Sequence, residues 1–158
     1  MKKTFKPKND LPPGSFVPLF RLLPTLAEQE TGKVILEQET FGLARGAYFL
    51  VESYCFDPDC DCRKVMINVM TDSSEILATI GFGWENEEFY VNWMDDEDLG
   101  RQATGAYLEP GGIQTANSEK CLILLKKSLR DSDYADLIKR HYQSFKNKIK
   151  ENSDKKKE

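Results

Sequence analysis

The stretch Tyr54-Cys55-Phe56-Asp57-Pro58-Asp59-Cys60-Asp61-Cys62-Arg63 joins two predicted strands and contains three of the four cysteines of the chain. Two sulfurs bound to one zinc ion lie about 3.8 Å apart, because Zn–S bonds measure about 2.3 Å and the ligands form a tetrahedron. Residues i and i+2 of an extended strand are about 6.6 Å apart. We therefore predict a loop that folds around a metal ion, with Cys55, Cys60 and Cys62 as zinc ligands that close a hairpin.

The residues around the cysteines favour this interpretation. Asp57-Pro58 is a turn signal, because proline presets φ and aspartate tolerates tight turns. The acidic residues beside the thiols disfavour a free thiolate. A nucleophilic cysteine needs the opposite surroundings. A divalent cation reverses this electrostatic effect, and Arg63 and Lys64 can offset the remaining negative charge.

Three alternatives stay open for this stretch. The cysteines could be ordinary reduced residues in a turn, or they could form a disulfide in an exported protein. The alternation of Asp57, Asp59 and Asp61 also matches the start of a calcium-binding loop. Against calcium, Cys62 stands where such a loop has glycine, and Asn68 stands where it has glutamate.

Three thiolates leave one zinc position to be filled. The first candidate is His141, the only histidine, on the apolar stripe of the predicted last helix. Cys121 and a water-bearing open position are the next candidates. If His141 is a ligand, the last helix is tied to the hairpin tip and metal binding contributes to folding.

Composition restricts the class of protein. The chain has 158 residues, 40% of them hydrophobic, and a net charge of −4, which predicts one globular domain. Residues 139–158 carry eight Lys/Arg and three Asp/Glu, a charge of +5, so the rest of the chain carries −9. An acidic body does not attract nucleic acid. No apolar run resembles a signal peptide or a membrane span, so we expect a cytoplasmic protein without a membrane partner.

Period-2 patterns predict an antiparallel meander of about four strands. The expected strands are 47–55, 64–71, 76–84 and 89–94, and a further short strand is possible at 33–38. A short helix is expected from Leu19 to Gln29, interrupted or restarted at Pro24. One face of the sheet should be buried in the core and the other less buried.

After the predicted sheet, the spacing of apolar residues changes from the pattern of a strand to that of a helix. A helix is expected from about Asp95 to Tyr107, a second begins near Ser118, and a last one begins at Ser132 or Asp133. The predicted fold class is therefore α+β, with C-terminal helices packed on one face of the meander. The expected organisation is an extended N-terminal arm over 1–18, a single domain over 19–150 and a disordered polar tail over 151–158.

The cysteine stretch, with Trp84-Glu85, Phe89-Tyr90 and Arg140-His141-Tyr142, resembles a family of uncharacterised bacterial proteins, some of which occur with the SEC-C zinc-binding motif. The SEC-C motif itself requires a distal Cys-His or Cys-Cys pair that this chain lacks. The resemblance covers patches of residues 47–145. It implies that Cys55, Cys60, Cys62 and His141 act together, and it implies no activity.

Three functions compete. The favoured one is a non-enzymatic module with structural zinc that binds an unknown protein partner, because the cluster has no recognisable catalytic companion. A zinc hydrolase would need an open metal position and a base from the acidic groups 85–88 or 95–98. Binding of single-stranded nucleic acid would use the basic C-terminus or the aromatic residues Trp84, Tyr90 and Trp93.

Overall fold

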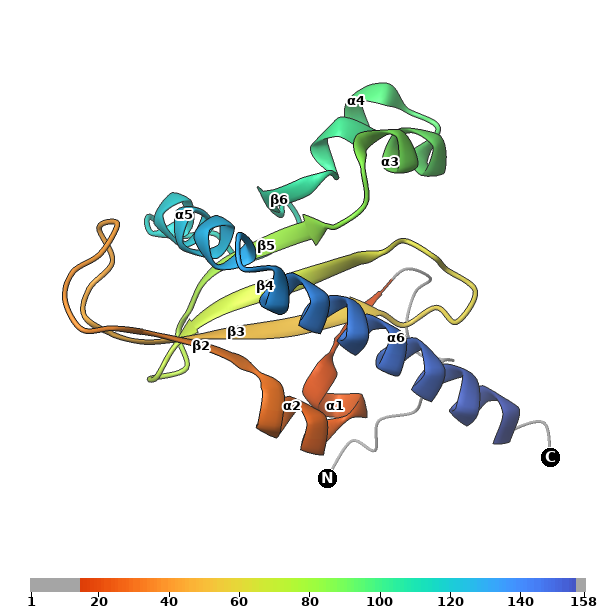
Figure 1. The fold of residues 1–158 in the computed structure, drawn as a ribbon, viewed down its shortest axis with the longest axis horizontal. Helices are drawn as coiled ribbons and strands as arrows, with labels where there is room; N and C mark the ends of the chain where they lie inside the picture. Colours follow the sequence, from red (N-terminus) through yellow and green to blue (C-terminus); the bar gives the residue numbers. More distant parts are fainter. Residues whose placement is uncertain (1–14, 156–158) are drawn as a thin grey trace.

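A computed structural model describes residues 15–155 of the chain. The strands form one antiparallel sheet in the order β1-β3-β4-β5-β6, and β2 also pairs with β3 (Figure 1). The predicted α+β class is confirmed. Within residues 15–155, no helix is long and apolar enough to cross a membrane.

Strand β3 is the longest and organises one edge of the sheet. Its last residues pair with β1, where Phe16 lies opposite Cys55, and its first half pairs with β2, where Gly32 lies opposite Leu50. The strands are β1 (Phe16–Pro18), β2 (Gly32–Leu36), β3 (Gly46–Cys55), β4 (Lys64–Thr71), β5 (Ile76–Gly83) and β6 (Gly105–Leu108). The three predicted strands 47–55, 64–71 and 76–84 are confirmed as β3, β4 and β5.

Helices precede and follow the strands β3, β4 and β5 along the chain. They are α1 (Leu19–Leu22), α2 (Pro24–Glu30), α3 (Glu87–Met94), α4 (Glu97–Gln102), α5 (Ser118–Leu129) and α6 (Ser132–Lys155). The restart at Pro24 is confirmed, because α2 begins with this proline in its first turn. Helix α6 runs diagonally across the sheet in Figure 1.

The predicted strand at 89–94 is wrong, because this segment is helix α3. The side chain of Asn86 caps the helix by accepting a 2.9 Å hydrogen bond from the Phe89 amide, and Glu87 and Glu88 occupy the first turn. These are helix-start signals that outweigh the alternation of apolar residues. The fourth strand of the meander is instead β6, whose Gly105 lies opposite Gly83 of β5.

The predicted helix from Asp95 to Tyr107 is shorter than expected. Asp95 has a left-handed backbone that ends α3, and Gly105 has a φ of 69° at the start of β6. Only Glu97–Gln102 is helical, as α4. Helices α3 and α4 therefore form an excursion between β5 and β6, which projects from the body in Figure 1.

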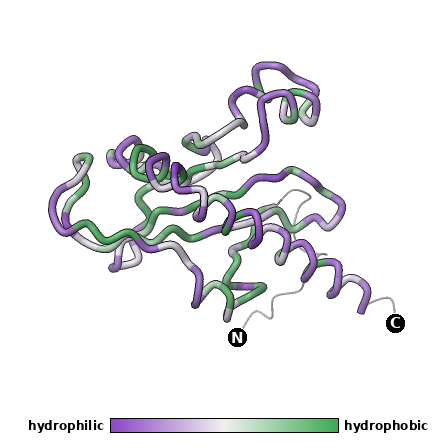
Figure 2. Tube along the Cα trace, viewed as in Figure 1, coloured by the Kyte–Doolittle hydropathy of each residue, from purple (hydrophilic) through white to green (hydrophobic). Residues whose placement is uncertain are grey.

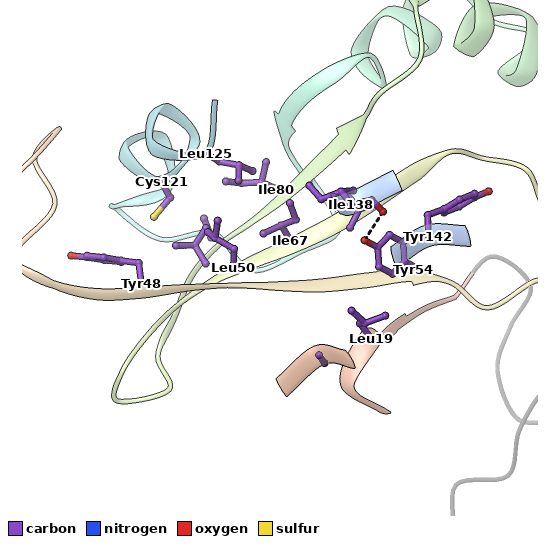
Figure 3. Close-up of a cluster of buried hydrophobic side chains, with 14 of the residues drawn as sticks. Leu19, Tyr48, Leu50, Tyr54, Ile67, Ile80, Cys121, Leu125, Ile138 and Tyr142 are labelled. Carbon is purple, nitrogen blue, oxygen red and sulfur yellow. Dashed lines mark hydrogen bonds between the residues drawn. The ribbon is translucent and has the colours of Figure 1, made fainter. Parts of the chain in front are cut away.

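The alternating residues of β4 confirm the two-faced pattern. Val65, Ile67 and Val69 are fully buried, whereas the residues between them are only half-buried. Figure 3 shows Ile67 and Ile80 of the sheet facing Leu125 and Ile138 of the C-terminal helices. Figure 2 shows that apolar colour follows the central strands while α6 is largely hydrophilic, consistent with an amphipathic helix that buries one stripe.

The structure describes only part of the predicted N-terminal arm and of the predicted C-terminal tail. Most of the expected arm, residues 1–14, lies outside the described residues, but Phe16–Pro18 forms β1 of the sheet. Part of the expected disordered tail is ordered, because α6 continues to Lys155. Residues 156–158 lie outside the described part.

Candidate metal centre

The predicted loop between two strands is present as residues 56–63, between β3 and β4. It begins with a turn in which the Cys60 amide donates to the Asp57 carbonyl at 3.3 Å. The Asp57 carboxylate also accepts a 2.9 Å hydrogen bond from the Asp59 amide, which tightens the turn. The chain therefore folds back after Cys55, as the spacing of the cysteines requires.

This fold brings the three predicted cysteine ligands together. The Sγ atoms of Cys55, Cys60 and Cys62 all lie within 4.8 Å of one another, and they are the only such group of three or more potential ligands among residues 15–155. Sulfurs around one zinc ion would be about 3.8 Å apart, a separation that lies within this limit. Cys55 and Cys62 are buried and Cys60 is partly exposed, so the cluster is accessible from the side of Cys60. The arrangement can hold a metal ion.

A buried charge lies beside the cluster, the ammonium of Lys146 from α6. Lys146 is only 4% exposed, and its Nζ donates to the carbonyls of Cys55, at 2.9 Å, and Asp57, at 2.7 Å. No carboxylate among residues 15–155 lies within ion-pair distance of it. A buried cation needs a counter-charge, and thiolate can supply it here.

The three thiols cannot all ionise easily without a cation. Hydrogen bonding from Cys62 lowers the pKa of Cys55 to about 5, against the effect of burial and with help from Lys146. The same hydrogen bond, burial and the neighbouring thiols raise the pKa of Cys62. Burial and the charge on Cys55 raise the pKa of Cys60. The free cluster therefore favours one thiolate, and a bound divalent ion would favour all three.

Arg63 leaves the loop with an unusual backbone that two tyrosines hold in place. Its φ is 48°, in the left-handed region. Its carbonyl accepts a 2.6 Å hydrogen bond from the Tyr90 hydroxyl of α3, and its amide donates to the Tyr142 hydroxyl of α6 at 3.3 Å. Its guanidinium pairs with Asp61 at 2.8 Å and Glu85 at 3.4 Å. These contacts fix the backbone beside Cys62.

The structure does not bring His141 to the cysteines. Its Nδ1 lies 2.7 Å from a carboxylate oxygen of Glu52 on β3, and its Nε2 lies 3.5 Å from Glu30 on α2. His141 is buried, as its place on the apolar stripe predicted, but it belongs to a second polar cluster in which the Tyr54 hydroxyl also donates to Glu52. Its neighbour on the helix, Tyr142, reaches the cysteine loop instead.

Cys121, the next candidate for the fourth ligand, also lies away from the cluster. It is fully buried on α5, and Figure 3 places it beside Leu50 and Tyr48, over the opposite half of the sheet from Tyr54 and Tyr142. Burial raises its pKa to about 11, so it is a neutral thiol in an apolar core. No fourth protein ligand joins the cluster within the described part of the chain.

Four of the acidic groups expected near a hydrolytic metal pair with arginines or cap a helix. Glu85 pairs with Arg63, Glu87 and Glu97 pair with Arg101, and Asp96 caps α4. Glu87, Glu97 and Asp96 thus stabilise the ends and surfaces of helices, whereas Glu85 contacts the cysteine loop through Arg63. Of the aromatic residues considered for base stacking, Tyr90 is buried, Trp84 packs edge-on against Tyr142 with ring centroids 5.0 Å apart, and Trp93 is 46% exposed.

A cavity of about 350 Å³ opens beside the cluster. Its lining comes from the loop and from buried and exposed residues of α6: Pro58, Asp59, Cys60, Asp61, Tyr142, Gln143, Lys146 and Lys150. Cys60 is the only one of the three cluster thiols in this lining. A fourth metal ligand that comes from solution would therefore have a route to the metal.

Sequence reasoning missed Lys146 and Glu52. Lys146 lies 91 residues from its hydrogen-bond partner Cys55, and Glu52 lies 89 residues from His141, so no local pattern connects them. One signal was present: both interrupt otherwise apolar stripes, Glu52 on the core face of β3 and Lys146 beside Phe145 on α6. Buried charged residues are rare unless they are paired.

No protein-family model, curated protein or solved structure matches this chain. The resemblance to a bacterial family in the cysteine stretch therefore stays a prediction. Only the geometry of the site therefore indicates what this protein does.

Proposed function

We propose that the chain binds one zinc ion through Cys55, Cys60 and Cys62, and that the metal has a structural role. The observation that carries this proposal is the convergence of the three sulfurs to within 4.8 Å. Zinc is favoured because thiolates are soft ligands that it prefers, whereas calcium and magnesium prefer oxygen. All four cysteines are free thiols, which suits the reducing cytoplasm that we expect.

The charge balance of the site supports a divalent ion. One Zn²⁺ with three thiolates carries a formal charge of −1, and the buried ammonium of Lys146 beside it would make the centre neutral. Neutral buried sites avoid the large desolvation cost of an isolated charge. The same ammonium ties the loop to α6 through two carbonyls, so metal and helix would together fix the connection between β3 and β4.

We further propose that this zinc-stabilised domain binds a protein partner. The support is the excursion formed by α3 and α4, which projects from the body and exposes Trp93 and Leu99, 46% and 49% accessible. Leu99 and Met94 border a second cavity of about 380 Å³ with Ala103 and Tyr107. Exposed aromatic and apolar side chains beside a cavity are typical of protein contact sites.

Metal analysis tests the first part of the proposal. Protein purified under reducing conditions should contain one zinc ion per chain by mass spectrometry, and Cys60→Ser should lose it. Cys121→Ser and His141→Ala are matched controls and should retain it, because neither residue lies at the cluster. Wild-type protein without metal would disprove the proposed function, and loss of zinc only in His141→Ala would show that the ligand set is different.

A zinc hydrolase remains the second candidate, and the cavity beside Cys60 is the observation that favours it. A metal with three protein ligands and an exchangeable water is the usual catalytic arrangement. Zinc-loaded protein should then hydrolyse activated esters faster than Cys60→Ser. Equal rates for the two proteins would leave the structural role as the better explanation.

A further inference from the structure

The candidate metal centre is incomplete on one side. Three thiolates supply three of the four positions that zinc takes, and the other cysteine and the one histidine of the chain, Cys121 and His141, lie elsewhere. The cavity of about 350 Å³ borders the cluster at Cys60, the one partly exposed thiol. Small-molecule sites typically measure about 300–1,000 Å³, so the cavity can accept a small ligand.

The charges in the lining restrict the chemistry of such a ligand. Lys146 balances the metal and its thiolates, and Asp61 is already paired with Arg63 at 2.8 Å. Two charges are then left in the cavity lining, the ammonium of Lys150 and the carboxylate of Asp59. Neither forms an ion pair with any residue from 15 to 155. A complementary ligand carries one carboxylate and one ammonium.

We propose that the fourth metal position binds a small zwitterionic thiol, of which free cysteine is the simplest example. This inference rests on the proposed metal function. On binding, the thiol would lose its proton to solvent and its sulfur would take the position that the three cysteines leave open. Its carboxylate pairs with Lys150 and its ammonium pairs with Asp59. A fourth sulfur suits a metal that already has three, because thiolate is a soft ligand.

Cobalt substitution provides the test. Full-length protein loaded with Co²⁺ is titrated with L-cysteine, with 3-mercaptopropionate, which lacks the ammonium, and with cysteamine, which lacks the carboxylate. Each bound thiol should change the visible d–d spectrum of the cobalt. We expect L-cysteine to bind more tightly than either analogue by about two- to fivefold, the effect of one exposed ion pair.

Variants of Lys150 and Asp59 then test which charge of the ligand each of these residues binds. Lys150→Gln should remove the advantage of L-cysteine over cysteamine, and Asp59→Asn should remove its advantage over 3-mercaptopropionate. Lys148→Gln is the matched control, because Lys148 is on the same helix but lies 3.9 Å from Glu151 and does not line the cavity. This control should leave the order of the three thiols unchanged.

The outcomes separate the two proposals. If the protein binds no Co²⁺ through its cysteines, both the proposed function and this inference are overturned. If Co²⁺ binds but its spectrum does not respond to thiols, the metal function stands and the inference fails. The inference also fails if the three thiols bind equally well, or if L-cysteine removes the cobalt from the protein.

Discussion

At the scale of single residues, the backbone of Arg63 connects the cysteine loop to the rest of the domain. A left-handed backbone costs a non-glycine residue roughly 1–2 kcal/mol, and the surrounding structure must hold it. The hydroxyls of Tyr90 and Tyr142 do so from two different helices. Because Arg63 directly follows Cys62, the position of that sulfur depends on both tyrosines.

Removing one of these hydroxyls should therefore weaken metal binding. Tyr90→Phe leaves the Arg63 carbonyl without its donor, and we expect the free energy of unfolding to fall by about 1–3 kcal/mol. We also expect a lower zinc affinity, measured by competition with a chromophoric chelator. Tyr48→Phe is the control, because its hydroxyl donates to Ala44 away from the cluster. Equal zinc affinity in the wild type and Tyr90→Phe would contradict this role.

The second residue-scale feature is the buried pair of His141 and Glu52. Burial lowers the pKa of His141, but the hydrogen bond and negative charge of Glu52, with the charge of Glu30, outweigh it, and the pKa is raised above its usual value of about 6.5. Burial and the same carboxylate raise the pKa of Tyr54 and of Tyr134, whose hydroxyl has no hydrogen-bond partner among the described residues. A protonated imidazole is therefore favoured in the folded protein.

This raised pKa predicts a direction for the pH dependence of stability. Protonation of His141 stabilises the folded state fully below about pH 6.5, and the contribution disappears as pH rises through the higher folded pKa. Urea unfolding between pH 6 and 9 should therefore show that the stability advantage of wild type over His141→Gln decreases with pH. An advantage that is constant or increases over this range would show that His141 is neutral in the folded protein.

At the scale of elements, the segment 85–108 shows where sequence reasoning succeeds and where it fails. The strands 47–55, 64–71 and 76–84 were predictable because period-2 patterns mark them as strands. Each also pairs with the strand that is next to it in the sequence. Helix α3 was not, because Phe89, Val91 and Trp93 alternate like a strand while Asn86 caps a helix. In the structure Tyr90 is the only fully buried residue of α3, so the alternation does not report burial.

The glycine at the base of this excursion should tolerate no side chain. A Cβ on Gly83 would lie 2.3 Å from the carbonyl oxygen of Ala103, a backbone atom that cannot rotate away. Gly83→Ala should therefore lower the free energy of unfolding by about 1–3 kcal/mol, measured by chemical denaturation. Gly111→Ala is the control, with its nearest atom at 3.8 Å, and should change it by less than about 0.5 kcal/mol. Similar effects at the two positions would contradict this packing.

At the scale of the whole molecule, the candidate site is assembled by contacts between distant parts of the chain. The spacing of the cysteines was sufficient to predict that Cys55, Cys60 and Cys62 converge. It could not predict which residue of α6 faces them, because His141, Tyr142 and Lys146 all lie within two turns of that helix. The choice depends on how the helix crosses the sheet, which is a property of the whole fold.

The proposed metal should also stabilise the whole domain. A ligand that binds only the folded state, at 100 times its dissociation constant, contributes about 2.7 kcal/mol. We therefore expect a chelator to lower the Tm of the wild-type protein by several degrees in a thermal scan under reducing conditions. Cys60→Ser should melt at the same temperature with and without chelator. A chelator effect of the same size in both proteins would mean that the stabilising metal binds elsewhere.

The distance in sequence between Cys55 and Lys146 also has a consequence for biosynthesis. A ribosome adds about 5–20 residues per second, so the 91 residues that separate these partners take roughly 5–20 s to make. For most of this interval the nascent chain carries all three cysteines while the lysine that closes the loop does not yet exist. Metal ions and oxidants therefore reach the thiols most freely before synthesis ends, and the order of translation favours metal capture ahead of helix docking.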